Sequence, residues 1–241
     1  MKENENVFKF NLHILRMKLG ILFSGGKDSS YAAYLAKKHR HELTCLISVF
    51  SENKNSYMFH TPSISRVKEQ AQAMNIPLIT KKTKGVKEKE LQDLENAIKK
   101  AKEKYKIKGI VTGAVESIYQ SSRIQRICNK LNIEVFNPLW QKDQIELLED
   151  LIRNKFNVII TSVAAYPLDS SWLGKNIDKK FIKEVRILNE KYGINPAGEG
   201  GEFETFVLNC PLFKKKLKVK SFNDLKEGEN SWRRNVEVEL K

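Results

Sequence analysis

A short glycine-rich segment near the start of the chain has the residues best suited to binding a nucleotide. It combines small, hydroxylic and charged residues: Ser24, Gly25, Gly26, Lys27, Asp28, Ser29 and Ser30. Glycines let the backbone approach phosphate oxygens, and successive N–H groups in a tight loop form a nest for anions. The serines are hydroxyl donors, Lys27 adds a positive charge, and Asp28 is a candidate ligand for Mg²⁺. The segment predicts a loop that binds the phosphates of ATP together with Mg²⁺.

The order of these residues excludes two common phosphate loops. The Walker A pattern needs glycine where the chain has Ile21 and a hydroxyl residue where it has Asp28, and no G-x-G-x-x-G is present. The run Ser-Gly-Gly-Lys-Asp-Ser instead resembles the PP-loop of N-type ATP pyrophosphatases. That family adenylates a carboxylate or carbonyl oxygen and releases pyrophosphate, which implies catalytic roles for Lys27 and Asp28.

Five further segments narrow this resemblance. Together they are similar to the diphthine–ammonia ligase family, and they cover residues 56–62, 113–123, 138–140, 168–174 and 195–205. The likeness runs from Met17 to about Phe213. It implies that the enzyme amidates the carboxylate of diphthine, a modified histidine of translation elongation factor 2, with ATP and ammonium. No cysteine lies near the N-terminus to serve a glutaminase, so free ammonium is the expected nitrogen source.

The resemblance also assigns roles to individual residues. It implies ATP contacts from His60, Gly113 and Glu116, in addition to the glycine loop. Ammonia must attack an acyl-adenylate, so acids that hold or deprotonate ammonium are expected nearby. The clustered candidates are Glu199, Glu202 and Glu204.

The substrate side of the site is expected to use a second group of residues. Tyr119, Gln120 and Arg123 are assigned to the cleft wall, although Glu116 and Arg123 could equally form an ordinary surface pair on a helix. Diphthine has a quaternary ammonium group, which favours aromatic and acidic neighbours. We therefore hypothesise a cation-binding wall from Trp172 with Asp169, or from Phe203. Without their flanking motifs, His60 would be a surface histidine and Trp172 a core residue.

Strands and helices alternate along the first part of the chain. Strands are expected at 18–24, 43–50, 76–80 and 109–113, and helices after the loop and at 63–74, 87–105 and 119–131. Ser29 or Asp28 is the expected cap of the first helix. This alternation predicts an α/β fold, a doubly wound parallel sheet of the PP-loop/HUP-like type.

The second part of the chain has a different pattern. Helices are expected at 144–154 and 178–192, a strand at 158–163, and three strands after a glycine-rich loop, the last at 236–240. We expect an extension at 1–16, a PP-loop ATP-binding domain at 17–136, and a smaller α+β substrate-binding domain at 137–241. The two domains should pack around a cleft.

The composition limits the partners. The net charge of +14 comes from 43 basic and 29 acidic residues, but nine of the basic residues are arginines, and the remainder are lysines spread among acidic neighbours. A lysine-rich solvated surface is therefore favoured over nucleic-acid binding, although the run 214–220 is denser. Two alternatives stay open: a PP-loop enzyme acting on tRNA, and a nucleotide-binding module without turnover.

Other features of the sequence concern the location of the protein. Cys45, Cys128 and Cys210 form no close pair, so we expect buried free thiols and no zinc site. No apolar run is long enough for a membrane span, and the expected location is the cytoplasm. The sequence leaves an oligomer open.

Overall fold

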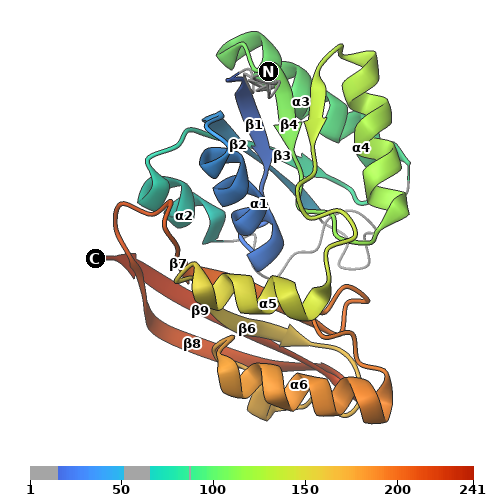
Figure 1. Ribbon diagram of the computed structural model, residues 1–241, viewed down its shortest axis with the longest axis vertical. Helices are drawn as coiled ribbons and strands as arrows, with labels where there is room; N and C mark the ends of the chain where they lie inside the picture. The colour runs from blue at the N-terminus through green and yellow to red at the C-terminus, as the bar shows by residue number, and fades with distance from the viewer. Residues whose placement is uncertain (1–15, 52–65, 87) are drawn as a thin grey trace, which may run out of the picture.

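The computed structural model describes residues 16–51, 66–86 and 88–241 of the chain. Figure 1 shows two sheets, one above the other, each with helices against it. The elements in chain order are β1 (Lys18–Leu22), α1 (Lys27–Lys38), β2 (Glu42–Ser51), α2 (Val67–Met74), β3 (Leu78–Thr83), α3 (Lys89–Tyr105), β4 (Gly109–Val111), α4 (Ile118–Lys130), β5 (Glu134–Phe136), α5 (Gln144–Arg153), β6 (Asn157–Val163), the 3₁₀ turn η2 (Ser170–Trp172), α6 (Lys179–Tyr192), β7 (Phe203–Asn209), β8 (Leu217–Gly228) and β9 (Ser231–Leu240).

The first sheet is parallel and doubly wound. Its strand order is β3-β2-β1-β4-β5, and every neighbouring pair is parallel. The order reverses between β1 and β4, and in such sheets ligands bind at this reversal, beyond the carboxyl ends of the strands. The predicted α/β fold is therefore confirmed, and the glycine loop directly follows β1 at the reversal.

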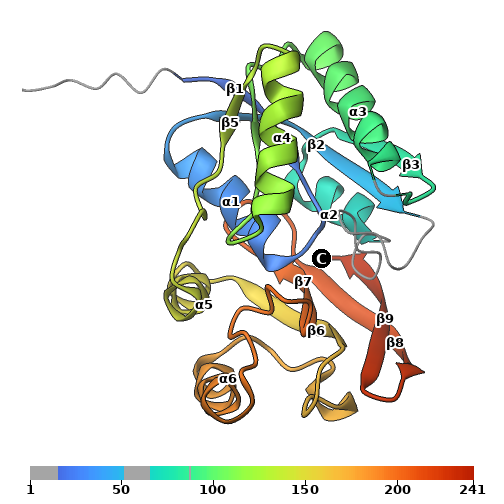
Figure 2. The ribbon, with the colours of Figure 1, turned by 90° about the vertical axis from the view of Figure 1, so that its right-hand side faces the viewer.

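Helices cover both faces of this sheet (Figure 2). On one face, apolar side chains of α1 and α2 pack against the sheet, including Ala32, Ala36 and Met74. On the other face, Leu94 and Ile98 of α3 pack with residues of α4. Because helices cover both faces, the interior of the central strand β1 and all of its neighbour β4 are buried, as in other parallel sheets.

The second sheet is smaller and antiparallel, in the order β7-β6-β9-β8. Residues of α5 and α6, such as Leu148 and Phe181, share a core with Val158 and Val207 of this sheet. A separate small core joins the sheet to Ala73 of α2. Beyond these cores β8 and β9 form a long hairpin, and most of β8 is exposed. The predicted smaller α+β unit is therefore present.

Two details differ from the sequence analysis. Neither Ser29 nor Asp28 caps α1, because the helix begins at Lys27 with Gly26 at its N-cap, and the Ser29 hydroxyl donates to the Gly26 carbonyl instead. The helix thus begins within the glycine loop. Strand β5 was not predicted, since three residues are too few to show a period. Residues 63–65 of the expected helix lie outside the described residues.

Two further expectations from the sequence concern the cysteines and a membrane span. Cys45, Cys128 and Cys210 are free and buried, as predicted. Burial raises the pKa of each thiol to about 12, so all three stay protonated at neutral pH. Within 16–51, 66–86 and 88–241, none of the helices combines the length and the apolarity that a bilayer crossing requires.

Candidate active site

A cavity of about 600 Å³ lies at the point where β1 and β4 diverge. This volume is typical of sites for small molecules. The first part of the chain contributes residues of the glycine loop and residues 112–114. The second part contributes several residues between Gly198 and Thr205, together with Glu227 of β8 and Ser231 and Arg233 of β9. Both halves of the chain therefore supply walls of one site.

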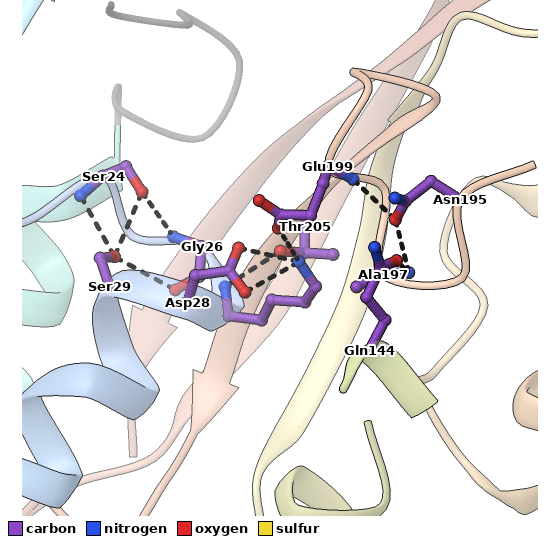
Figure 3. Close-up of polar contacts among 10 residues, drawn as sticks. Ser24, Gly26, Asp28, Ser29, Gln144, Asn195, Ala197, Glu199 and Thr205 are labelled. Atoms are coloured by element: carbon purple, nitrogen blue, oxygen red, sulfur yellow. Dashed lines mark hydrogen bonds and ion pairs between the residues drawn. The ribbon is translucent and has the colours of Figure 1, made fainter. Parts of the chain in front are cut away.

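The glycine loop presents its polar groups at one end of this cavity. The Ser24 and Ser29 hydroxyls lie 3.2 Å apart, and the amide of Gly26 points to the Ser24 hydroxyl (Figure 3). The Ser30 hydroxyl is buried and has no hydrogen-bond partner within the described part of the chain. The N-terminus of α1 adds partial positive charge at the same place. The loop is therefore suited to an anion with several oxygens, such as a polyphosphate.

Gly113, shortly after the end of β4, lies very close to the first turn of α1. A Cβ at this position would lie 2.6 Å from the carbonyl carbon of Asp28. No other residue fits there without moving the first turn of α1. Gly113 thus lies against the start of α1, directly after the glycine loop, and its contact with a nucleotide stays a prediction.

Lys27 is the central charge of the glycine-loop end. Its Nζ lies 2.8 Å from Asp28 Oδ2 and 3.7 Å from Glu199 Oε1, and its side chain is 4% exposed. Burial by itself lowers the pKa of Lys27, but the two carboxylates outweigh it and raise the pKa above its usual value. The lysine is therefore charged at any physiological pH.

Glu199 has the opposite balance. Burial and the nearby Asp28 carboxylate raise its pKa, Lys27 lowers it, and the result is about 7. Glu199 can therefore gain or lose a proton near neutrality, as a general acid or base must.

Neutral side chains join the glycine loop to the second sheet. The Lys27 amide donates to Thr205 Oγ1 at 3.0 Å, and the Val207 amide donates to the Gly25 carbonyl at 3.1 Å. The buried Gln70 carboxamide of α2 donates to the Gly25 and Val207 carbonyls, at 2.9 and 2.8 Å. The outer edge of β7 is thus paired with the loop, which fixes the loop's position.

The three candidate glutamates point in different directions. Glu199 faces Lys27, whereas Glu202 accepts from the Asn195 amide at 3.1 Å and holds the preceding loop. That loop is also braced by Asn195 Oδ1, which accepts from the Ala197 and Glu199 amides (Figure 3). Glu202 is not among the residues that line the cavity, but Glu204 is. The three glutamates predicted as one cluster therefore lie apart. Glu199 is at the glycine-loop end of the cavity, Glu202 holds a loop, and Glu204 is at a second end of the cavity.

That second end is formed by charged residues. Glu204 lines the cavity with Glu227 and Arg233, and the Arg233 guanidinium lies 2.8 Å from the Glu227 carboxylate. Burial raises the pKa of Glu204 to about 7; Arg233 lowers it and Glu227 raises it. We call Glu204, Glu227 and Arg233 the hairpin cluster.

The residues assigned to the cleft wall are only partly gathered at the cavity. Gln120 lines it. The Arg123 guanidinium instead stacks on the Tyr119 ring, 3.5 Å from its centroid, and pairs with Glu88. Neither Tyr119 nor Arg123 is among the lining residues.

Glu116 and Arg123 do not form the surface pair that the sequence left open. The Gln144 carboxamide donates to Glu116 at 2.9 Å, while Arg123 contacts Glu88. Glu116 lies outside the cavity lining, although its charge contributes to the raised pKa of Glu199.

The two proposed cation walls differ in their surroundings. The Trp172 ring has the Lys175 ammonium 3.8 Å from its centroid, and Asp169 accepts from the amide and hydroxyl of Ser171. Phe203 lines the cavity and stacks edge-on against Phe181. Phe203 is therefore better placed for a ligand in the cavity than Trp172 is. His60 lies outside the described residues.

The acidic groups of the site are consistent with magnesium that arrives with a nucleotide. Across the described ranges, no group of three or more His, Cys, Asp and Glu side chains is arranged to hold a metal ion. Mg²⁺ commonly uses one or two carboxylates together with substrate phosphates and water. The Asp28 carboxylate, which lines the glycine-loop end of the cavity, fits that pattern.

Comparison with known proteins identifies the family. Residues 17–135 match the family described as diphthamide synthase N-terminal domain, and residues 143–239 match diphthamide synthase C-terminal domain. The chain belongs to the diphthamide synthase family.

Members of the diphthamide synthase family with curated names are similar over most of this chain. A protein of Bos taurus named diphthine–ammonia ligase is 36% identical over 226 residues, which cover 85% of this chain and 84% of that protein. The Danio rerio protein of that name is 33% identical, with 83% and 86% covered. The Saccharomyces cerevisiae protein is 30% identical and longer, so that 33% of it is covered. These relatives are enzymes by name, and this chain is a member of the same enzyme family.

A solved structure, titled as a predicted subunit of tRNA methyltransferase from Methanocaldococcus jannaschii, has a more distant likeness. It is 20% identical, covers 81% of this chain and 98% of its own, and has a TM-score of 0.40. At that score the likeness carries no argument.

Several residues at the site of this diphthamide synthase family member were not singled out from the sequence. Gln70 has no motif signal because it follows Val67 on an apolar helix face. Thr205 ends the segment 195–205, so the motif could have indicated it. Glu227 and Arg233 belong to an exposed hairpin without a recognisable pattern, and only the strand pairing brings them to the cavity.

Proposed function

We propose that this protein is a diphthine–ammonia ligase that converts the carboxylate of diphthine on elongation factor 2 to an amide. The observation that carries the proposal is the glycine loop with its buried Lys27, at the sheet reversal of a chain that belongs to the diphthamide synthase family. The names of the curated relatives support the same reaction. We expect it to act in the cytoplasm.

The two parts of the chain have different roles in this proposal. Residues 17–136 hold ATP, with the pyrophosphate portion on the loop from Ser24 to Ser30. Residues 137–241 present the substrate side of the cavity. Lys27 attracts the phosphates, and the Ser24 and Ser29 hydroxyls, which line the cavity, are placed to donate to them. Asp28 would hold Mg²⁺ together with the phosphates, and the ion neutralises phosphate charge when it is bound.

A carboxylate needs activation before ammonia can attack it. Its oxygen attacks the α-phosphorus of ATP, the bond to pyrophosphate breaks, and an acyl-adenylate forms. Ammonia then adds to the acyl carbon and AMP leaves, so that the net products are the amide, AMP, pyrophosphate and one proton. Ammonium must lose a proton before it attacks, and a glutamate with a pKa of about 7 is suited to accept it.

Glu199 is the residue best placed for that proton transfer at the phosphate end. Its carboxylate oxygen lies 3.7 Å from the Lys27 ammonium, beside the loop that would hold the phosphates.

The experiment is an incubation with Mg-ATP, ammonium and diphthine-bearing elongation factor 2. Nucleotides are separated by chromatography, and the modified histidine peptide is followed by mass spectrometry. AMP together with a carboxylate-to-amide mass change is the expected result. If AMP forms only with tRNA, the substrate is tRNA and not elongation factor 2. If ATP binds and no AMP forms, the protein is a nucleotide-binding module without turnover.

A further inference from the structure

Gln144, the first residue of α5, joins two loops that come from different halves of the chain. Its Nε2 donates to Glu116 Oε1 at 2.9 Å, and its Oε1 accepts from the Ala197 amide at 3.1 Å. Glu116 lies in the loop between β4 and α4, and Ala197 lies in the loop between α6 and β7. Both loops supply residues to the walls of the cavity. We call this pair of hydrogen bonds the Gln144 bridge.

The contact at Ala197 extends to Glu199 through further hydrogen bonds. The Ala197 amide is shared between Gln144 Oε1 and Asn195 Oδ1, each 3.1 Å away (Figure 3). Asn195 Oδ1 also accepts from the Glu199 amide at 3.0 Å. Ala197 itself is fully buried. The loop that positions the Glu199 carboxylate therefore has Gln144 as one of its supports.

The backbone around Gln144 is held without help from its side chain. The Gln141 amide donates to the Val115 carbonyl at 2.8 Å. The Asp143 carboxylate caps α5, because it accepts from the Glu146 amide at 2.8 Å. A substitution at Gln144 can therefore remove the bridge while α5 keeps its place.

The carboxamide of Gln144 suits its two partners in one orientation. A carboxylate only accepts hydrogen bonds and a backbone amide only donates one, so Glu116 needs a donor and Ala197 needs an acceptor. Gln144→Glu would place a second carboxylate against Glu116. Gln144→Met, which is of similar length, would bond neither partner. The residue type is thus matched to the bridge.

Other side chains also connect the two halves of the molecule, but Gln144 differs from them in what it reaches. Gln70 and Thr205 hold the backbone of the glycine loop. Gln144 instead holds the loop of Glu199, and its other partner, Glu116, is one of the charges that raise the pKa of Glu199. One carboxamide therefore fixes both the candidate proton acceptor and a charge that acts on it.

We propose that Gln144 is a positioning residue, which holds Glu199 at the glycine-loop end of the cavity so that it can take the proton from ammonium. The proposal rests on the proposed function and deepens it. Gln144 is not among the residues that line the cavity, so it acts through Glu199 and not on the reactants. Loss of the bridge leaves the carboxylate intact and frees its loop to move.

A double-mutant cycle tests whether Gln144 acts through Glu199. AMP formation with Mg-ATP, ammonium and diphthine-bearing elongation factor 2 is measured for Gln144→Met, Glu199→Gln and the variant with both changes. Gln144→Met alone should lower kcat by about tenfold and leave the KM for ATP unchanged, because the proton acceptor is misplaced. In the Glu199→Gln background the same change should lower kcat by less than about twofold, since residues that act as one unit are not additive.

A purely structural contact would give a different result. Gln144→Met would then lower kcat by the same factor in both backgrounds, or would lower the urea midpoint and leave kcat unchanged. Either result would overturn the proposal.

Two further variants complete this test. Gln125→Met is the matched control, because it removes a carboxamide that donates to Asn129 at 2.8 Å on the exposed side of α4, and it should leave kcat unchanged. Gln144→Asn retains a carboxamide but is one methylene shorter, so it cannot span both partners. It should lower kcat as Gln144→Met does, and it decides the test if Gln144→Met does not fold.

Amide hydrogen exchange separates this proposal from the ligase itself. Exchange of the Ala197 and Glu199 amides is followed by NMR in the wild type and in Gln144→Met, without any substrate. We expect both amides to exchange about tenfold faster in the variant, and equal rates would overturn the positioning role. If the wild type does not amidate diphthine, the ligase is wrong, and the exchange rates still decide whether Gln144 holds the loop of Glu199. If diphthine is amidated and the cycle is additive, the positioning role is wrong and the ligase stands.

Discussion

The glycine-loop end of the cavity combines the buried Lys27 with backbone groups that neutral side chains fix, whereas the hairpin end is built from charged side chains on a largely exposed ribbon. At the first end, Gly113 and Gln70 leave little freedom for change, because Gly113 lies against the backbone of α1 and the Gln70 side chain bonds two backbone carbonyls. At the second end, an isosteric substitution can remove a charge without removing a contact surface. The glycine-loop end is therefore set largely by the fold, and the hairpin end by side-chain identity.

The largest effect expected from this difference is at Lys27. Lys27→Met should lower the rate of AMP formation by about 10²–10³-fold, because a buried charge aimed at the reacting phosphates is lost. The rate is measured by chromatography of the nucleotides. Lys38→Met, at the exposed end of the same helix, is the control and should retain full activity. A loss of less than tenfold at Lys27 would contradict the role of the loop.

The next effect concerns the pH dependence of stability. The pKa of Glu204 is raised to about 7 by burial, so its contribution to stability is fully present below its unfolded pKa and is lost as pH rises to 7. The free energy of unfolding should fall by on the order of 3 kcal/mol over this window. Glu204→Gln should remove that part of the pH dependence in urea titrations. An identical slope in the variant and the wild type would show that Glu204 titrates normally.

A smaller effect is expected at the connection between the sheets. Gln70→Leu removes the donor to Gly25 and Val207 and should lower the free energy of unfolding by about 1–3 kcal/mol. The KM for ATP should rise, since the loop is less well fixed. Urea denaturation and initial rates give the two quantities. Gln72→Leu, on the exposed side of the same helix, should change neither.

The smallest effect concerns the encounter with the protein substrate. Lys216→Glu with Lys218→Glu reverses two exposed charges at the base of the hairpin. At low salt, kcat/KM for elongation factor should fall by about tenfold, since steering depends on the net field. The difference should vanish near 1 M salt. Lys99→Glu with Lys100→Glu on α3 is the control, and an equal loss there would indicate an effect of net charge rather than of the hairpin.

The sequence predicted the features that lie within one continuous segment of the chain. It did not predict the features that form only where distant segments meet. The glycine loop, its strand and its helix follow from residues 18–38, because their spacing encodes both structure and chemistry. The predicted helix cap was wrong because α1 begins at Lys27, so Asp28 and Ser29 already lie inside the helix.

The distribution of the glutamates depends on pairings between distant segments. Glu199, Glu202 and Glu204 read as one cluster in the sequence, yet the cross-strand pair of Glu204 with Ser162 turns it away from Lys27. Glu227 and Arg233 reach the cavity through the β8–β9 pairing, which no local pattern specifies.

The hydrogen bond from the Val207 amide to the Gly25 carbonyl bears on how such a chain can vary. Through this bond the glycine loop pairs with β7, the edge strand of the second sheet. A strand far along the chain therefore completes a motif near its start. A gene divided between the two sheets would encode two fragments, and neither would contain a finished phosphate site. Recombination that exchanged one of the two halves would therefore have to preserve this hydrogen bond.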